Sequence, residues 1–371
     1  MPRAQRQQLT WLFVTSALAL SVALVFLRLQ LPAWQLLPDE MHATLSTWHS
    51  KASERMFSLS LNDRQTALLS AMLLGQRNHM TWEIRGLYAQ AGASHLLALS
   101  GLHLSILLVL FQFLLRQVLH NRLWRAVLTL TLLTLLWAYT LLTGCSPSLL
   151  RAAIMTSLWM LTQMSGESGK TWHSFCMAAC IILFFDPQAL HSLSFQLSFA
   201  AVAGILLFYM PLCRQIPDPR HPMKWLWQGW CVSTSALIGS APLAVYYFHT
   251  FSVSGFLLSP LYILLATGIL YGGLFLLLTG QGTNLAGWLM DVQHTIMQWA
   301  TSMPGSTMEN LHPTPWQVMF IYLGFFLTLP VLNALQPRTL DFASFRIRRA
   351  LRQWPYFVAA ATCMLTAWIM P

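Results

Sequence analysis

Long apolar runs separated by short polar segments dominate this chain. Runs long enough to cross the roughly 30 Å hydrocarbon core of a bilayer fall at 11–31, 95–119, 123–142, 225–249, 255–279, 315–335 and 354–370, with shorter or more polar ones at 147–164, 171–186 and 189–210. The pattern predicts an all-α fold, a polytopic transmembrane bundle of about nine to eleven helices. The first run is too long for a signal peptide core and lacks a cleavage site, so we expect an uncleaved membrane anchor.

Residues 285–303 show a different pattern, that of an amphipathic helix. Apolar residues recur at helical spacing, and Asp291, His294, Thr295 and Gln298 lie between them. Such a helix either lies in the membrane interface or crosses with its polar face toward a bundle interior. The number of spans in the last third of the chain therefore stays open at this stage.

Composition supports the membrane interpretation. Of 371 residues, 56% are hydrophobic and 9% are charged, whereas a soluble domain carries roughly 25% charged residues. An ordinary soluble globular protein is thereby excluded. The six cysteines have no metal-ligand spacing, and SGESGKT at 165–171 has Met164 where a phosphate-binding loop begins with glycine. We expect neither a metal nor a cofactor.

The basic residues are distributed asymmetrically among the short loops. Loops 116–125, 165–171 and 211–224 together hold seven Lys and Arg residues, and the alternating loops 143–147, 186–188 and 250–254 hold none. The positive-inside rule then predicts a cytoplasmic N-terminus, with 32–94 outside. The formal net charge of +10 is compatible with anionic lipid headgroups and with a polyanionic substrate such as nucleic acid.

Polar residues inside apolar runs are costly and mark candidate sites. In SHLLALSGLHLSIL, His95 and His103 recur at helical spacing on either side of Ser100-Gly101. Two imidazoles on one helix face suit a proton relay, a metal half-site or a polar lining, and a buried histidine bonded to a carbonyl is the purely structural interpretation. Gly101 allows a helix or a substrate to approach the backbone.

A second cluster is Arg151, about one helical turn after Pro147. An arginine at this depth needs a partner or a water path, unless it snorkels to the near interface. A third cluster begins at Asp186, which with the following proline is also an ordinary turn and helix-start signal.

The rest of this third cluster and a fourth cluster also carry polar residues into apolar runs. Gln196 and Ser198 follow Asp186 in a span rich in small residues, and a hydroxyl-rich segment at 232–259 contains Pro242 and Tyr247. Hydroxyl groups around a proline in mid-span suit a broken helix that lines a cavity.

These segments resemble the membrane channel domain of ComEC-type competence proteins. The resemblance covers about 65–280, and more loosely extends to 335. It rests on TALLSAMLLGQRN, SHLLALSGLHLSIL, LLTGCSPSLLRAAIM, DPQALHSLSFQLSFAAVAGIL and SALIGSAPLAVYYFHTFSVSGFLLSPL. The matched positions are His95, Ser100, Gly101, His103, Arg151, Asp186, Phe195, Gln196, Ser198, Pro242, Tyr247 and Phe248.

The resemblance implies transport of single-stranded DNA across the cytoplasmic membrane in natural transformation. It divides the chain into an anchor (1–31), a short external segment (32–64), a channel domain (65–335), and a basic loop with a last span (336–371). The external loop is too short for the family's OB-fold domain, and no HxHxD-type motif of its metallo-β-lactamase-like nuclease is present. The chain is therefore expected not to be an enzyme.

Single-stranded DNA and membrane lipids are the expected partners. A separate nuclease or DNA-receptor protein, and further copies of this chain, are additional candidates. Arg151 and the external Arg64, Arg77 and Arg85 are expected to supply positive charge to a DNA path, and Tyr246, Tyr247 and Phe248 an aromatic surface.

Other functions remain open from the sequence. One is a membrane-embedded hydrolase with Ser100 as nucleophile and His95 or His103 as base. Others are an inactive or accessory scaffold, and a transporter of another polyanion or of a lipid-linked glycan.

Overall fold

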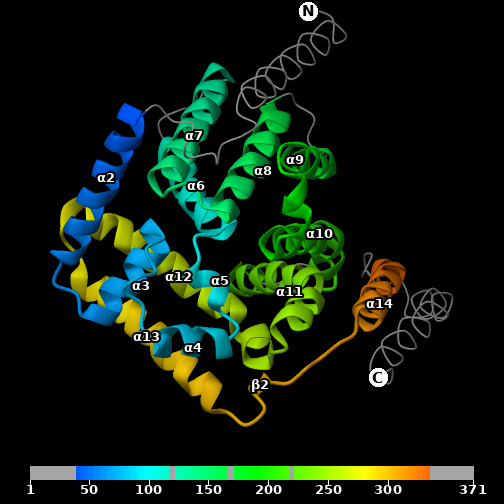
Figure 1. Cartoon of the computed structure of the whole chain (residues 1–371). Coiled ribbons are helices and arrows are strands. Elements are labelled where there is room, and N and C mark those ends of the chain that lie inside the picture. The colour runs from blue at the N-terminus through cyan, green and yellow to red at the C-terminus, as the bar shows by residue number, and fades with distance from the viewer. Residues whose placement is uncertain (1–38, 117–121, 165–170, 217–220, 335–371) are drawn as a thin grey trace, which may run out of the picture. The chain divides into compact units, whose positions relative to one another are not determined.

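A computed structural model of the chain describes residues 39–116, 122–164, 171–216 and 221–334 (Figure 1). Within these residues the regular structure is helical except for two short strands, β1 (Phe251–Ser252) and β2 (Thr307–Met308), which pair antiparallel. The predicted all-α fold class is confirmed.

The chain forms two compact units. The first contains the described parts of Met1–Trp82, His95–Phe195 and Leu265–Gln293, and the second those of Glu83–Ser94, Gln196–Leu264 and His294–Pro371. The helices are α2 (Asp39–Phe57), α3 (Asp63–Leu74), α4 (Trp82–Gln90), α5 (Ser94–Leu97), α6 (Gly101–Arg116), α7 (Arg122–Leu142), α8 (Pro147–Met164), α9 (Thr171–Phe185), the 3₁₀ helix η2 (Pro187–His191), α10 (Leu193–Cys213), α11 (His221–Phe248), α12 (Val253–Thr279), α13 (Thr283–Ser302) and α14 (Pro315–Ala334).

Three of these helices are long and apolar enough to cross a membrane, judged by length and composition: Leu193–Cys213, Leu226–Phe248 and Val253–Thr279. Shorter apolar helices occupy Gly101–Leu115, Val127–Leu142, Thr171–Phe185 and Pro315–Pro330. The runs at 11–31 and 354–370 lie outside the described residues. The total of nine to eleven spans therefore stays a prediction.

The first unit is built around a three-helix core of α6, α7 and α8. Its apolar cluster consists of Leu104, Leu108, Leu132, Leu136, Leu149, Ala153 and Met160. The same three helices also bury His103, Thr140 and Arg151. Helix α3 is also buried along nearly its whole length, from Gln65 to Leu74. The segment predicted to lie outside the membrane thus contributes an interior helix to this unit.

In the second unit, α10 and α11 cross at very short range. A methyl group added to Gly204 would overlap the Ser235 carbonyl oxygen, and one added to Gly239 would overlap the Ala200 carbonyl oxygen. Small residues permit such close helix crossings in membranes. From α14, the Tyr322 hydroxyl donates to the Gly239 carbonyl oxygen at 2.7 Å, so three helices meet at this crossing.

Helix α13 forms where the amphipathic pattern predicts a helix, and the face that it buries is not the one that carries Leu285, Trp288 and Trp299. The buried residues are Ala286, Met290, Gln293, Met297 and Ala300. Among the predicted apolar positions, Leu285, Trp288 and Trp299 are each about 60% exposed, at 61%, 60% and 58%. A bilayer gives apolar side chains a favourable environment outside the protein, so the apolar face need not be the packed one.

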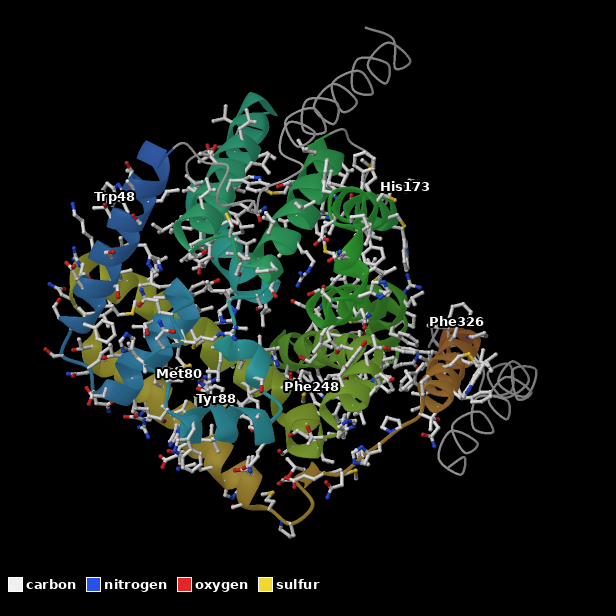
Figure 2. The ribbon with its side chains drawn as sticks, viewed as in Figure 1. Trp48, Met80, Tyr88, His173, Phe248 and Phe326 are labelled. Atoms are coloured by element: carbon white, nitrogen blue, oxygen red, sulfur yellow. The ribbon has the colours of Figure 1, made fainter. Side chains whose placement is uncertain are left out.

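Large exposed apolar side chains occur on several other helices. Figure 2 shows Trp48 on α2 and Phe326 on α14, which are 62% and 59% exposed. By contrast, Tyr88 on α4 is fully buried. Exposed aromatic side chains of this kind suit contact with lipid.

Candidate functional site

The first candidate cluster lies where α5 ends and α6 begins. Helix α5 ends at Leu97 and α6 begins at Gly101, so the apolar run 95–119 is not one helix. The expectation that His95 and His103 share one continuous helix face is therefore wrong. His95 is exposed, whereas His103 is fully buried.

Ser100 and His103 are directly bonded at the start of α6. The Ser100 carbonyl oxygen accepts a backbone hydrogen bond from Leu104 at 3.2 Å, which is the arrangement of a helix N-cap. The Ser100 Oγ lies 2.9 Å from His103 Nδ1. His103 Nε2 is buried and makes no hydrogen bond of acceptable geometry with the described residues, although the Leu96 backbone interacts with the ring. A buried polar atom in this state costs about 1–3 kcal/mol.

Gly101 brings this cluster close to α8. A Cβ atom at Gly101 would lie 3.0 Å from the Cβ of Ala152. Because Ala152 directly follows Arg151, the close approach places the start of α6 beside the helical turn that carries the arginine. The absence of a side chain at Gly101 permits this packing.

Arg151 is buried, with 6% of its surface exposed, and hydroxyl and carbonyl groups hold its guanidinium. Its Nη2 donates to the Ser194 carbonyl oxygen at 2.9 Å and to Ser148 Oγ at 3.2 Å, and it also contacts Ser194 Oγ. The two serine hydroxyls lie 3.1 Å from each other. These bonds fix an arginine inside an apolar helical unit.

Asp186 has a local structural role. Its carboxylate accepts hydrogen bonds from the backbone N–H groups of Gln188 and Ala189 at 3.1 and 3.2 Å, and it caps η2. The side chain is exposed. The geometry is that of the turn and helix start that the Asp-Pro sequence indicates.

Two predicted site residues of the second unit contact each other. The Tyr247 hydroxyl, near the end of α11, donates to Gln196 Oε1 of α10 at 2.8 Å. Tyr247 is 40% exposed, and the ring of Tyr246 packs edge-on against it at 5.1 Å. Ser198, two residues after Gln196, is half-buried.

Pro242 is buried within a continuous helix. Helix α11 runs unbroken from His221 to Phe248, so the helix break expected at this proline is wrong. Backbone groups that a proline frees in a transmembrane helix are readily satisfied by neighbouring groups and small backbone adjustments.

The external arginines fall into two groups. Arg64 forms an ion pair with Asp291, whereas Arg77 and Arg85 are exposed. Arg64 thus already has a carboxylate partner on α13.

Three polar residues that contact the candidate residues or their partners were not predicted as site residues: Ser148, Ser194, which belongs to the cluster that begins at Asp186, and Gln65, whose Nε2 donates to Asp291 Oδ2 at 3.1 Å. Ser148 stands three residues before Arg151, on the same helix face, and this spacing is a usable signal. Ser194 and Gln65 contact residues 43 and 226 positions away, so their partners follow only from the fold.

From the sequence pattern we expect no metal site. Within the described part of the chain, no group of three or more His, Cys, Asp or Glu residues could hold a metal ion.

Comparisons with known proteins place residues 72–334 within the profile of a family described as "Competence protein". ComE operon protein 3 of Bacillus subtilis is 29% identical over 286 residues, which cover 74% of this chain and 35% of that protein. Recombination protein 2 of Haemophilus influenzae is 29% identical over 208 residues, 51% of this chain and 25% of that protein. An uncharacterized Escherichia coli protein is 25% identical over 292 residues, 72% of this chain and 38% of that protein.

The matches thus span between a quarter and two fifths of the length of these relatives. No solved structure matches the chain.

Proposed function

Because the chain belongs to the Competence protein family, we propose that it forms part of the path by which single-stranded DNA crosses the cytoplasmic membrane in natural transformation. The family match covers most of the described helices, from the last residues of α3 to the end of α14. The proposed orientation has the N-terminus in the cytoplasm, as the loop charges predict. Proposed partners are single-stranded DNA and lipids, with a separate nuclease or DNA receptor and further copies of the chain as additional candidates.

The observation that carries this proposal is the buried arginine of α8. An ionisable residue inside a membrane segment usually marks a substrate or ion path. DNA presents one phosphate per nucleotide, and arginine binds phosphate through planar, paired donors. Ser148 and Ser194 hold the Arg151 guanidinium in place, so its position is set before a substrate arrives.

The neighbouring residues fit the same role. Gly101 lets α6 approach the arginine-bearing turn, and Ser100 and His103 add polar atoms beside it. In the second unit, the exposed ring of Tyr247 offers a surface on which bases of any sequence stack. These features suit a polymer that moves through without sequence readout.

Transformation assays on chromosomal variants test the proposal. We expect Arg151→Ala and His103→Ala each to lower the transformation frequency about tenfold or more. A tenfold decrease corresponds to the loss of roughly 1.4 kcal/mol of DNA binding in the path. The matched control is Arg214→Ala, which removes an exposed arginine and the same charge. Membrane levels of each variant are measured by immunoblot. Undiminished uptake in a well-inserted Arg151→Ala variant would contradict the proposal.

A second candidate is a membrane-embedded serine hydrolase, which the 2.9 Å contact between Ser100 Oγ and His103 Nδ1 favours. A catalytic histidine also needs an orienting group on its other ring nitrogen, and among the described residues His103 has no such partner beyond the Leu96 backbone. Ser100 stands at the N-cap position of α6, where the same bond provides a partner for a buried His103 nitrogen without any catalysis. A fluorophosphonate probe decides: labelling that Ser100→Ala abolishes would establish the hydrolase, and its absence would support the transport proposal.

A further inference from the structure

Two exposed histidines lie side by side where the short β-ladder joins two distant segments. His249 directly follows α11, and His312 lies between β2 and α14. The pairing of Phe251 with Met308 and of Ser252 with Thr307 brings these segments together. The two imidazole ring centroids are 4.3 Å apart, with an interplanar angle of 46°.

Backbone and side-chain bonds fix the position of His249. Its carbonyl oxygen accepts from the Leu311 backbone N–H at 2.9 Å, and its Nδ1 lies 3.0 Å from the Leu311 carbonyl oxygen. A carbonyl oxygen can only accept, so Nδ1 carries the hydrogen and donates. The neutral ring therefore has its lone pair on Nε2.

This arrangement matches that of a metal-binding histidine. Histidines that bind metals almost always donate their other ring N–H to a carboxylate, a backbone carbonyl or water, which fixes the tautomer and the ring orientation. At His249 the Leu311 carbonyl has this role, and the ring of His312 lies beside it as a second imidazole, with 4.3 Å between the ring centroids.

We propose that His249 and His312 form a binding site for a divalent first-row transition-metal ion of the Zn²⁺, Ni²⁺ and Cu²⁺ class. Imidazole nitrogen is a preferred ligand for these ions. Both side chains are exposed, so water molecules complete the coordination shell. With two protein ligands the ion exchanges readily, and the affinity is highest for Cu²⁺, as the Irving–Williams order requires.

Binding at this site has a structural consequence for the second unit. The ion joins the end of α11 to the segment before α14, two positions that are already bonded through His249 and Leu311. Because the ion binds only when both histidines are in place, it stabilises the folded arrangement by mass action. Added Zn²⁺ should therefore raise the unfolding temperature of the wild-type protein.

The test uses the full-length protein in detergent, purified without a polyhistidine tag. Electron paramagnetic resonance with one equivalent of Cu²⁺ counts the coordinating imidazole nitrogens, and calorimetric titration with Zn²⁺ measures the affinity. The variants are His249→Asn and His312→Gln. Asparagine is chosen because His249 has a φ of 59°, a left-handed conformation that asparagine tolerates well. His79→Ala is the matched control, since it removes an exposed histidine whose ring packs against Phe57.

We expect two coordinating nitrogens in the wild type and one in each variant. The affinity for Zn²⁺ should fall about tenfold or more in both variants, because removing a ligand should cost at least as much as removing a partner of a ligand. The His79→Ala variant should bind Zn²⁺ as the wild type does. A wild-type spectrum with a single imidazole would overturn the proposal, even where a variant fails to fold. Variants that retain wild-type affinity would overturn it as well.

Discussion

Arg64 and Asp291 join α3 to α13, with Arg64 Nη2 2.6 Å from Asp291 Oδ1. The neighbouring Gln65 donates from Nε2 to Asp291 Oδ2 at 3.1 Å and to the Gly287 carbonyl oxygen at 3.3 Å. Gln65 also completes a capping box with Asn62 at the start of α3. One end of a buried helix is thereby fastened to the amphipathic helix through three side chains.

We predict that Gln65→Ala destabilises the protein more than Arg64→Ala does. Gln65 is buried, so its removal leaves polar groups without partners at about 1–3 kcal/mol. The side chains of Arg64 and Asp291 are 35% and 47% exposed, and exposed ion pairs contribute only about 0–1 kcal/mol. Thermal unfolding of the detergent-solubilised variants measures the difference.

Salt provides the control for this prediction. Screening weakens an exposed ion pair, so high salt should shrink the gap between wild type and Arg64→Ala and leave the effect of Gln65→Ala unchanged. An Arg64→Ala variant as unstable as Gln65→Ala would show that the ion pair, and not the buried amide, holds α3 in place.

The positions of several helices follow closely from the sequence, whereas α2, α3 and α4 lie in a segment predicted only as an external loop, and the run 95–119 divides into α5 and α6. The apolar run 147–164 coincides with α8, and 171–186 with α9 to within one residue. Apolar length and flanking turn residues are local properties, so they can be read directly. The packed face of α13 could not be read in this way. In a membrane, apolar residues are stable on the outside, and the buried side of α13 carries two alanines, two methionines and Gln293.

The candidate site was only partly predictable. Gln196 and Tyr247 were both identified from sequence, but their contact depends on how α10 and α11 cross. The partner of Arg151 at Ser194 depends on a contact between segments 43 residues apart. Polar residues in apolar runs thus reveal where a site lies, whereas their pairing is a property of the tertiary structure.

The crossing of α10 and α11 predicts a strong effect of one methyl group. Gly239→Ala should lower the free energy of unfolding by about 1–3 kcal/mol, the usual cost of overpacking, because the new Cβ overlaps the Ala200 carbonyl oxygen. Gly86→Ala on α4 is the matched control. Its Cβ would meet nothing within 4 Å, so this substitution should be stabilising by about 0.5–1 kcal/mol. Equal melting temperatures for the two variants would contradict the close crossing.

Tyr247 allows stacking to be separated from hydrogen bonding. Tyr247→Phe removes the hydroxyl that donates to Gln196 but keeps the ring, so transformation should stay within about twofold of wild type, whereas Tyr247→Ala should lose the roughly 1–3 kcal/mol of one stacked base. Transformation frequencies normalised to membrane protein level make the comparison. If Tyr247→Phe is as defective as Tyr247→Ala, the hydroxyl and not the ring is the functional group.

Ser194 is predicted to position Arg151 rather than to contact DNA itself. Ser194→Ala removes the hydroxyl but leaves the backbone carbonyl that accepts from Arg151 Nη2 at 2.9 Å, so uptake should fall less than in Arg151→Ala. Adding Ser148→Ala removes the other hydroxyl partner and should bring uptake close to that of Arg151→Ala. Of the two hydroxyls and the Ser194 carbonyl that contact the guanidinium, only the carbonyl then remains. Ser194→Thr keeps a hydroxyl and should restore most of the activity. A Ser194→Thr variant no better than Ser194→Ala, at equal membrane level, would show that the hydroxyl does not act through the arginine.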